Sequence, residues 1–98
     1  MIVEIQVLPS PAGTPEQRYA HVEAAIAAIG ASGLRYEVGP LGTSIEGEPD
    51  EVWPLLRTVH EAALRSGADG LVSVIKLAQS GDPARQASMA DLTGKFRS

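Results

Sequence analysis

Three short stretches of the chain alternate apolar and polar residues, and a fourth is rich in β-branched and apolar residues. The alternating stretches run from Ile2 to Pro9, from Leu34 to Val38 and from Thr43 to Glu46. The fourth runs from Leu71 to Leu77. A period of two favours half-buried β-strands, and β-branched runs favour buried ones. Turn residues at positions 39 to 42 separate the two middle stretches, so we expect four strands with the middle pair joined as a hairpin.

Between these strands, apolar residues recur at helical spacing in two longer segments. Thr14, Pro15 and Gln17 have the identities of a helix start, because Thr can cap, Pro suits the first helical position and Gln completes a capping box. We therefore expect the first helix to begin there and to end at Gly30, and the second to run from near Asp50 to Gly67. Their apolar stripes are Tyr19, Val22, Ile26 and Ile29 in the first helix, and Val52, Leu55, Leu56, Val59 and Ala63 in the second.

The resulting order is strand, helix, strand, strand, helix, strand. This order is typical of an α+β ferredoxin-like βαββαβ sandwich. Two right-handed crossovers would place both helices on one face of a four-stranded antiparallel sheet. We interpret residues 1–98 as a single domain of this kind, with a short terminal helix indicated by the spacing of Met89, Leu92 and Phe96. The side chains expected to meet the helices are Val3, Ile5, Val7, Tyr36, Val38 and Ile45.

Composition excludes several classes of function. A net charge of −4 argues against nucleic-acid binding, and the absence of cysteine excludes disulfides and thiolate metal sites. The first strand begins at Ile2 and no apolar run reaches membrane-spanning length, so we expect a soluble, cytoplasmic protein. Lys95 and Arg97 form a small basic tail, interpreted as solvated or as a partner for a neighbouring subunit's acidic patch.

Few residues suggest catalysis. His21 and His60 fall on different helices, and we interpret both as helix-surface residues. No nucleophile elbow, Gly-rich loop after the first strand or His-x-x-x-His metal pair is present in the sequence. Trp53 falls off the apolar stripe of its helix, as residues at an interface, at a pocket edge or on a partly covered surface do. We therefore do not expect an enzyme.

The hairpin is better suited to binding. If positions 40 and 41 form the turn, Glu37 lies opposite Ser44 and Glu46 lies opposite Arg35 on one face of the sheet. A carboxylate beside a hydroxyl and an aromatic ring can hold a cationic heterocycle through charge-assisted hydrogen bonds and stacking. The alternatives are a solvated acidic surface and, for the core-facing Tyr36, simple packing.

Several segments resemble a known family. They are VEIQVLP, GLRYEVGPLGTSIEGEPDEVW, the His-Glu pair at positions 60 and 61, SVIKL and the terminal GKFRS. Together they are similar to a small ferredoxin-like family, the thiamine-binding proteins, and the most specific run lies at positions 36 to 48. The resemblance implies binding of thiamine or its hydroxymethylpyrimidine moiety, and pairing of domains into dimers and tetramers. The candidate ligand-binding residues are Tyr36, Glu37, Thr43, Ser44 and Glu46.

We therefore expect a non-catalytic domain that binds thiamine or a related hydroxymethylpyrimidine-type molecule. We expect no cofactor, no metal, no nucleic acid and no membrane partner, and self-association as a homodimer or homotetramer. The alternative is a regulatory or structural protein-interaction module without a small-molecule ligand, in which the acidic hairpin is a docking patch.

Overall fold

The computed structural model describes residues 1–97, and Ser98, the last residue of the GKFRS segment, lies outside the described residues. The strands are β1 (Ile2–Ser10), β2 (Arg35–Val38), β3 (Thr43–Glu46) and β4 (Gly70–Ala78). The helices are α1 (Ala20–Gly30), α2 (Pro49–Arg65) and α3 (Met89–Thr93), with short 3₁₀ turns at Pro83–Arg85 and Gly94–Phe96. This order confirms the predicted α+β ferredoxin-like arrangement and the predicted short helix after the last strand.

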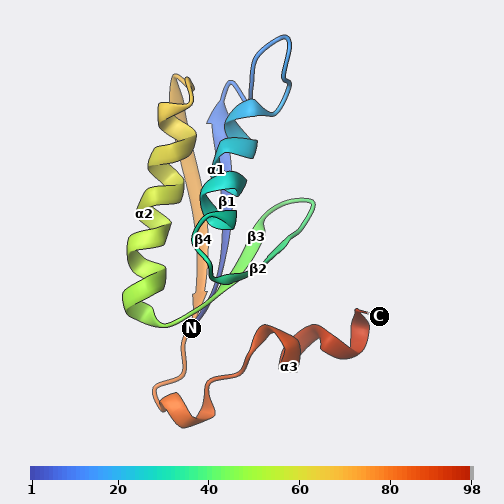
Figure 1. Cartoon of the computed structure of the whole chain (residues 1–98), viewed down its shortest axis with the longest axis vertical. Coiled ribbons are helices and arrows are strands. Elements are labelled where there is room, and N and C mark those ends of the chain that lie inside the picture. Colours follow the sequence, from blue (N-terminus) through green and yellow to red (C-terminus); the bar gives the residue numbers. More distant parts are fainter. Residues whose placement is uncertain (98) are drawn as a thin grey trace.

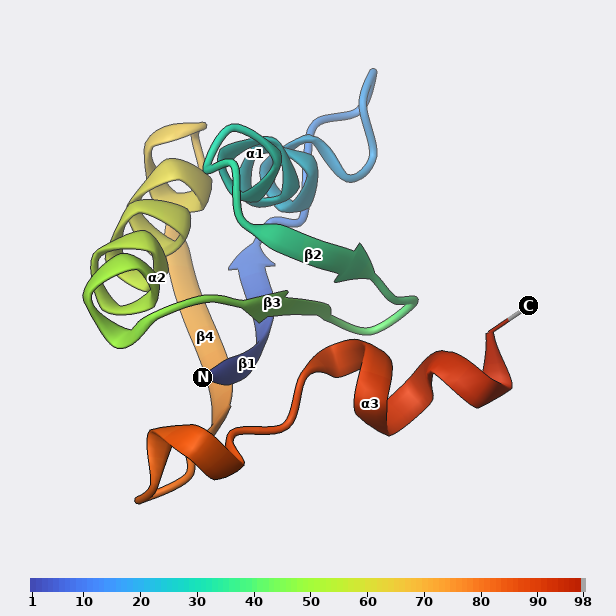
Figure 2. The same cartoon turned by 60° about the horizontal axis from the view of Figure 1, so that its bottom comes forward.

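The sheet is antiparallel, with the strand order β2-β3-β1-β4. Helices α1 and α2 lie side by side on one face of it (Figure 1). The segment after β4 lies on the other side of the hairpin (Figure 2). The long strand β1 occupies the centre because it pairs with β3 on one side and with β4 on the other. The sheet therefore has one face toward the two helices and one open face.

The hairpin has the register that alternation predicts. Tyr36 pairs with Ile45 and Glu37 with Ser44, and the Gly39 N–H donates to the Gly42 carbonyl over 2.8 Å to close the turn. Strand side chains alternate between the two faces. The hairpin thus directs Ile45 and Thr43 toward the helices and Glu37, Ser44 and Glu46 toward the open face.

The core lies between the sheet and the two helices α1 and α2. All members of the apolar stripe predicted for α2 are buried against the sheet residues Val3, Ile5 and Ile45. Helix α2 begins with a capping box in which Glu48 and Glu51 each accept the other's backbone N–H, and Pro49 fits its first turn. Within residues 1–97, no helix combines the length and the apolar character needed to cross a membrane.

The predicted start of the first helix is wrong. The Thr14 hydroxyl accepts a hydrogen bond from the Gln17 N–H over 3.0 Å, as a cap would, but the Gln17 carbonyl accepts the Thr14 N–H over 2.9 Å. These two bonds close a separate turn, so the helical hydrogen bonds do not continue from it. The chain then reverses, and α1 begins at Ala20.

Two further expectations about burial are also wrong. Val38 is 51% exposed, because β2 is an edge strand that α1 covers only in part. His21 is 3% exposed, and its Nδ1 lies 2.6 Å from the Ser66 Oγ at the end of α2. His60 is half-buried, with its Nδ1 2.6 Å from the Ser73 Oγ on β4. Both histidines therefore join α1 or α2 to neighbouring elements, and neither is a simple surface residue.

Candidate functional site

The predicted ligand-binding residues divide between the two faces of the sheet. The structure brings Glu37, Ser44 and Glu46 together on the open face. Thr43 is 4% exposed and points to the helix side, where Tyr36 also lies but is 41% exposed. A sheet separates the two groups, so they cannot all contact one small ligand. Each face is therefore a separate candidate.

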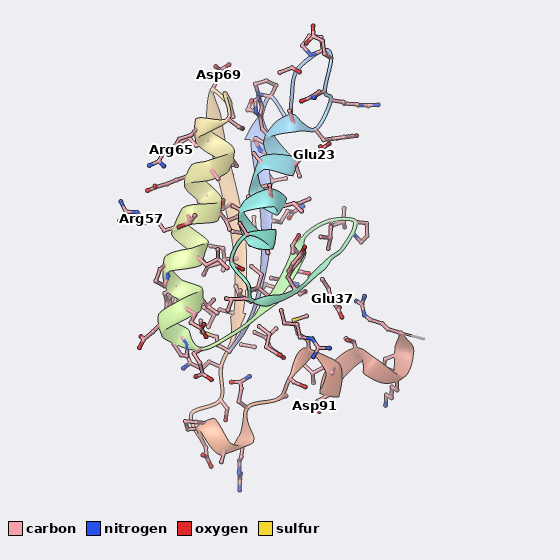
Figure 3. The ribbon with its side chains drawn as sticks, in the orientation of Figure 1. Glu23, Glu37, Arg57, Arg65, Asp69 and Asp91 are labelled. Atoms are coloured by element: carbon pink, nitrogen blue, oxygen red, sulfur yellow. The ribbon has the colours of Figure 1, made fainter. Side chains whose placement is uncertain are left out.

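On the open face, both acidic residues of the hairpin already have partners within the chain. The Glu46 carboxylate accepts the backbone N–H of Met89, the first residue of α3. The Glu37 Oε2 lies 3.3 Å from the Arg97 Nη1, and Figure 3 shows Glu37 directed toward the C-terminal segment. We call residues 79–97 the C-terminal strap, because this segment crosses the open face beside the hairpin.

The strap is anchored by one buried side chain and a well-formed helix start. Met89 is only 4% exposed. The Ser88 Oγ accepts the Asp91 N–H and the Asp91 carboxylate accepts the Ser88 N–H, each over 3.0 Å. Hydrogen bonding of the Asp91 carboxylate to Ser88, first through the Ser88 backbone N–H and then through its side chain, holds the pKa of Asp91 below its ordinary value. Arg97 therefore pairs with its own chain in this structure while its side chain stays 60% exposed, as expected for a solvated tail.

The remaining part of the open face, over β1 and β4, is exposed and largely apolar. Leu8 is 48% exposed, Val72 60% and Val74 45%. The charged pair on this surface joins Lys76 Nζ to Glu4 Oε1 over 3.7 Å, and both side chains are well exposed. Such a pair contributes little to stability. The exposure of Leu8, Val72 and Val74 shows that this surface is uncovered in a single chain.

On the helix side, a cavity of about 340 Å³ lies between α1, β1 and the hairpin turn. We call it the α1 cavity. Ligand-binding pockets usually measure about 300–1,000 Å³ and are mostly apolar with a few polar groups. None of its lining residues is charged, and the Thr43 side chain and the Tyr19 phenol are among its few polar groups. Its lining comprises Ile5, Gln6, Val7, Tyr19, Val22, Ala25, Ile26, Ile29, Gly39, Pro40, Leu41, Gly42, Thr43 and Val59.

Helix α1 contributes four residues to the wall of this cavity. They are Val22, Ala25, Ile26 and Ile29. Val22 and Ile26 are one helical turn apart and line the cavity as half-buried side chains. Sequence reasoning assigned both to the apolar stripe of the first helix, and it gave the Tyr36 and Thr43 side, between sheet and helices, only as a second location for the site. No single segment reveals the cavity, because α1, β1 and the hairpin turn form its walls together.

A second hollow of about 470 Å³ lies beside the N-terminus and the strap, and its lining includes Glu46, Glu48 and Glu51. These carboxylates already accept hydrogen bonds from the Met89 N–H or within the α2 capping box. Among residues 1–97, no cluster of three or more acidic, histidine or cysteine side chains has the geometry of a metal site. The α1 cavity is therefore the better-formed candidate for a small organic molecule.

The His-Glu pair of the family resemblance lies away from this cavity. His60 contacts Ser73, whereas Glu61 forms ion pairs with Arg57 and Arg65, which Figure 3 shows on the outer side of α2. The Arg57 guanidinium is 2.8 Å from the Glu61 carboxylate, and this hydrogen bond lowers the pKa of Glu61. Glu61 therefore has a structural role on the helix surface.

The fold and the cavity thus define the class of protein. It is a four-stranded ferredoxin-like sandwich with an apolar, ligand-sized cavity under its first helix. The chain belongs to the thiamine-binding protein family, which it matches over residues 3–96. This confirms the resemblance inferred from the hairpin motif and its flanking segments.

Individual relatives agree with this assignment. The chain is 31% identical over 75 residues to the UPF0045 protein CPE1503 of Clostridium perfringens, covering 76% of this chain and 77% of that protein. A solved domain of unknown function from Bacillus cereus has a TM-score of 0.83 at 27% identity, over 98% of this chain and 88% of the other. A Thermotoga maritima structure, provisionally ascribed to thiamine biosynthesis or salvage, has a TM-score of 0.76 at 23% identity, over 99% and 100%. At that identity the last comparison shows the fold alone.

Proposed function

We propose that this domain binds thiamine or a related hydroxymethylpyrimidine without catalysing a reaction on it, and that the α1 cavity holds the pyrimidine ring. The observation that carries this proposal is an uncharged cavity of about 340 Å³ lined in part by the buried Thr43. Membership of the thiamine-binding protein family supports the class of ligand.

The chemistry of the ligand fits this division of polar and apolar surface. An aminopyrimidine is flat and neutral, so it gains from contact with aliphatic side chains and needs only a few hydrogen-bonding partners. The Thr43 hydroxyl and the backbone of the Gly39–Gly42 turn are suitable partners at the wall of the cavity. The thiazolium ring carries a permanent charge, and burying an unpaired charge is costly. We therefore place the thiazolium outside the cavity, where the net charge of −4 favours it.

That Glu37 or Glu46 contacts the cation stays a prediction. Both carboxylates hold the strap in this structure, so a cation on the open face would have to displace Arg97 or the Met89 N–H. The double variant Glu37→Gln/Glu46→Gln distinguishes a site on the open face from a site in the α1 cavity. Loss of a charge-assisted hydrogen bond would weaken binding by roughly ten- to a hundredfold, whereas a ligand in the α1 cavity would bind unchanged.

We also propose that the domain self-associates, through the exposed part of the open face or through sheet edges. The support is the apolar surface formed by Leu8, Val72 and Val74, since small domains gain stability by burying such a face. Light scattering over micromolar concentrations should give the mass of a dimer or tetramer. The mass of one chain throughout that range would refute self-association.

Calorimetry and thermal melting with thiamine and with hydroxymethylpyrimidine test the function. Ligand at a hundred times its Kd should stabilise the domain by about 2.7 kcal/mol. Val22→Phe should fill the α1 cavity and abolish binding while the fold is retained. Ala27→Phe adds the same ring on an exposed position of the same helix and is the matched control. Glu61→Gln, on the outer side of α2, is the charge control for the amide variants.

Absence of binding by the wild-type domain would overturn the proposed function and favour the interaction module. Binding that survives Val22→Phe but is lost in the Glu37→Gln and Glu46→Gln double variant would instead place the ligand on the open face.

A further inference from the structure

Several lining residues of the α1 cavity are exposed, and two of them, Tyr19 and Leu41, carry large apolar side chains. Tyr19 directly precedes α1 and is 52% exposed, and Leu41 in the hairpin turn is 78% exposed. By contrast, Ala25, Ile29 and Thr43 in the same lining are almost fully buried. A lining residue that also meets solvent marks the place where a cavity opens. Tyr19 and Leu41 therefore lie at the mouth, one from α1 and one from the hairpin.

The Tyr19 ring makes a cation–π contact with the neighbouring residue. The Arg18 guanidinium lies over the ring, 5.5 Å from its centroid, within the range of a cation–π contact. Tyr19 is the N-cap residue of α1, yet its side chain makes no capping hydrogen bond. An exposed aromatic residue at a cap position contributes little to the fold, because caps favour small polar side chains there. Its position is therefore better explained by what it presents to the cavity.

We propose that Tyr19 and Leu41 form a clamp that selects flat heterocycles. This inference rests on the proposed function and extends it by naming the residues that set ligand specificity. Arg18 covers one face of the Tyr19 ring, and the pyrimidine ring of the ligand stacks on the other. Leu41 closes over the ligand edge from the hairpin turn. Aromatic rings prefer offset-stacked or edge-to-face geometry, so a saturated ring of equal size binds less well.

The test compares Tyr19→Ala, Tyr19→Leu and Tyr19→Phe by calorimetry with hydroxymethylpyrimidine. Tyr19→Phe keeps the ring, so its Kd should stay within about twofold of wild type, whereas Tyr19→Ala should raise the Kd by about tenfold. Tyr19→Leu keeps apolar bulk and helix propensity but removes stacking, and should also weaken binding. Leu41→Ala should raise the Kd by about threefold, since it removes part of an apolar contact.

Phe96 offers a matched control. Its ring is 76% exposed and has Lys95 Nζ 5.0 Å from its centroid, so it has the same kind of cation–π arrangement far from the α1 cavity. Phe96→Ala should bind the ligand as wild type does. Melting curves of the Tyr19, Leu41 and Phe96 variants should superimpose on that of wild type without ligand, because none of these three side chains is buried.

The outcomes distinguish the clamp from the function on which it rests. If wild type does not bind thiamine or hydroxymethylpyrimidine, the proposed function fails and the clamp with it. If wild type binds and Val22→Phe abolishes binding, but Tyr19→Ala and Tyr19→Leu bind normally, the cavity stands and the clamp is overturned. Equal affinity for hydroxymethylpyrimidine and cyclohexylmethanol would also overturn the clamp.

Discussion

Removing the Met89 side chain should detach the C-terminal strap without unfolding the sandwich. Among residues 1–97, the strap is held near the hairpin by the buried Met89 side chain, by the Met89 N–H bound to Glu46, and by the ion pair between Arg97 and Glu37. Burial of a methionine side chain contributes about 1.5–3 kcal/mol, and a hydrogen bond to a carboxylate contributes a similar amount. The ion pair contributes about 0–1 kcal/mol, because it is exposed.

Met89→Ala therefore removes close to half of the attachment. A loss of about 2 kcal/mol raises the population of the detached strap roughly thirtyfold. Met89 is buried, yet it is not part of the cluster of core residues that joins the sheet to α1 and α2. The effect should consequently stay local, and the melting temperature of the domain should change little.

Hydrogen exchange measured by mass spectrometry would test this, at equal protein concentration for each variant. Amides of residues 86–97 should exchange at least tenfold faster in Met89→Ala, while those of β1 and α2 keep their protection. Leu92→Ala, on the same short helix but 56% exposed, is the control and should leave strap exchange unchanged. Two results would refute the reasoning: unchanged exchange of the strap, or loss of protection in β1 together with the strap. The second would show that the strap belongs to the cooperative core.

Three further predictions follow from single positions. Thr43→Val preserves shape and strand propensity but removes the hydroxyl from the α1 cavity. Calorimetry should therefore show ligand binding weakened by about two- to thirteenfold at unchanged stability. Equal affinity would exclude the hydroxyl as a hydrogen-bonding partner of the ligand. Gly67→Ala should lower the free energy of unfolding in urea by about 1–3 kcal/mol. Its φ is +124°, and a Cβ would lie 3.2 Å from the His21 Cε1, so a neutral result would be inconsistent with that strain. Hydrogen bonds from Ser88 lower the pKa of Asp91, so its contribution to α3 is complete at neutral pH and disappears as pH falls through that lowered pKa. Strap proteolysis should rise in that acid range, and Asp91→Asn should reduce this rise, because the amide does not titrate; a rise equal to that of wild type would refute the contribution of Asp91.

Local patterns were sufficient for the sheet and for α2. Alternation with period two assigns Tyr36 and Ile45 to one face and Glu37 and Ser44 to the other whenever the two strands pair in register. A one-residue slip would expose Ile45, so burial itself selects the register. The α2 stripe is similarly predictable, since its apolar residues recur at the helical period and all are buried. The order of elements then restricts the topology to the ferredoxin-like arrangement.

Local patterns failed where a residue's environment comes from a distant element. The Thr14 signal for a helix start was satisfied by a separate turn, and His21 became buried because the end of α2 packs against it. Alternation alone cannot predict that Glu46 will bind the backbone of a residue more than forty positions away. These contacts depend on how the packed elements meet.

The sequence by itself thus determined which side chains share a face, because parity and helical period are properties of the local backbone. Only the tertiary structure decided which parts of each face are available to a ligand. The strap binds the carboxylates of the hairpin, and the packing of α1 against β1 and the hairpin turn leaves a cavity that Thr43 helps to line. A cavity is volume left unfilled by several elements at once, so no single segment of the chain encodes it.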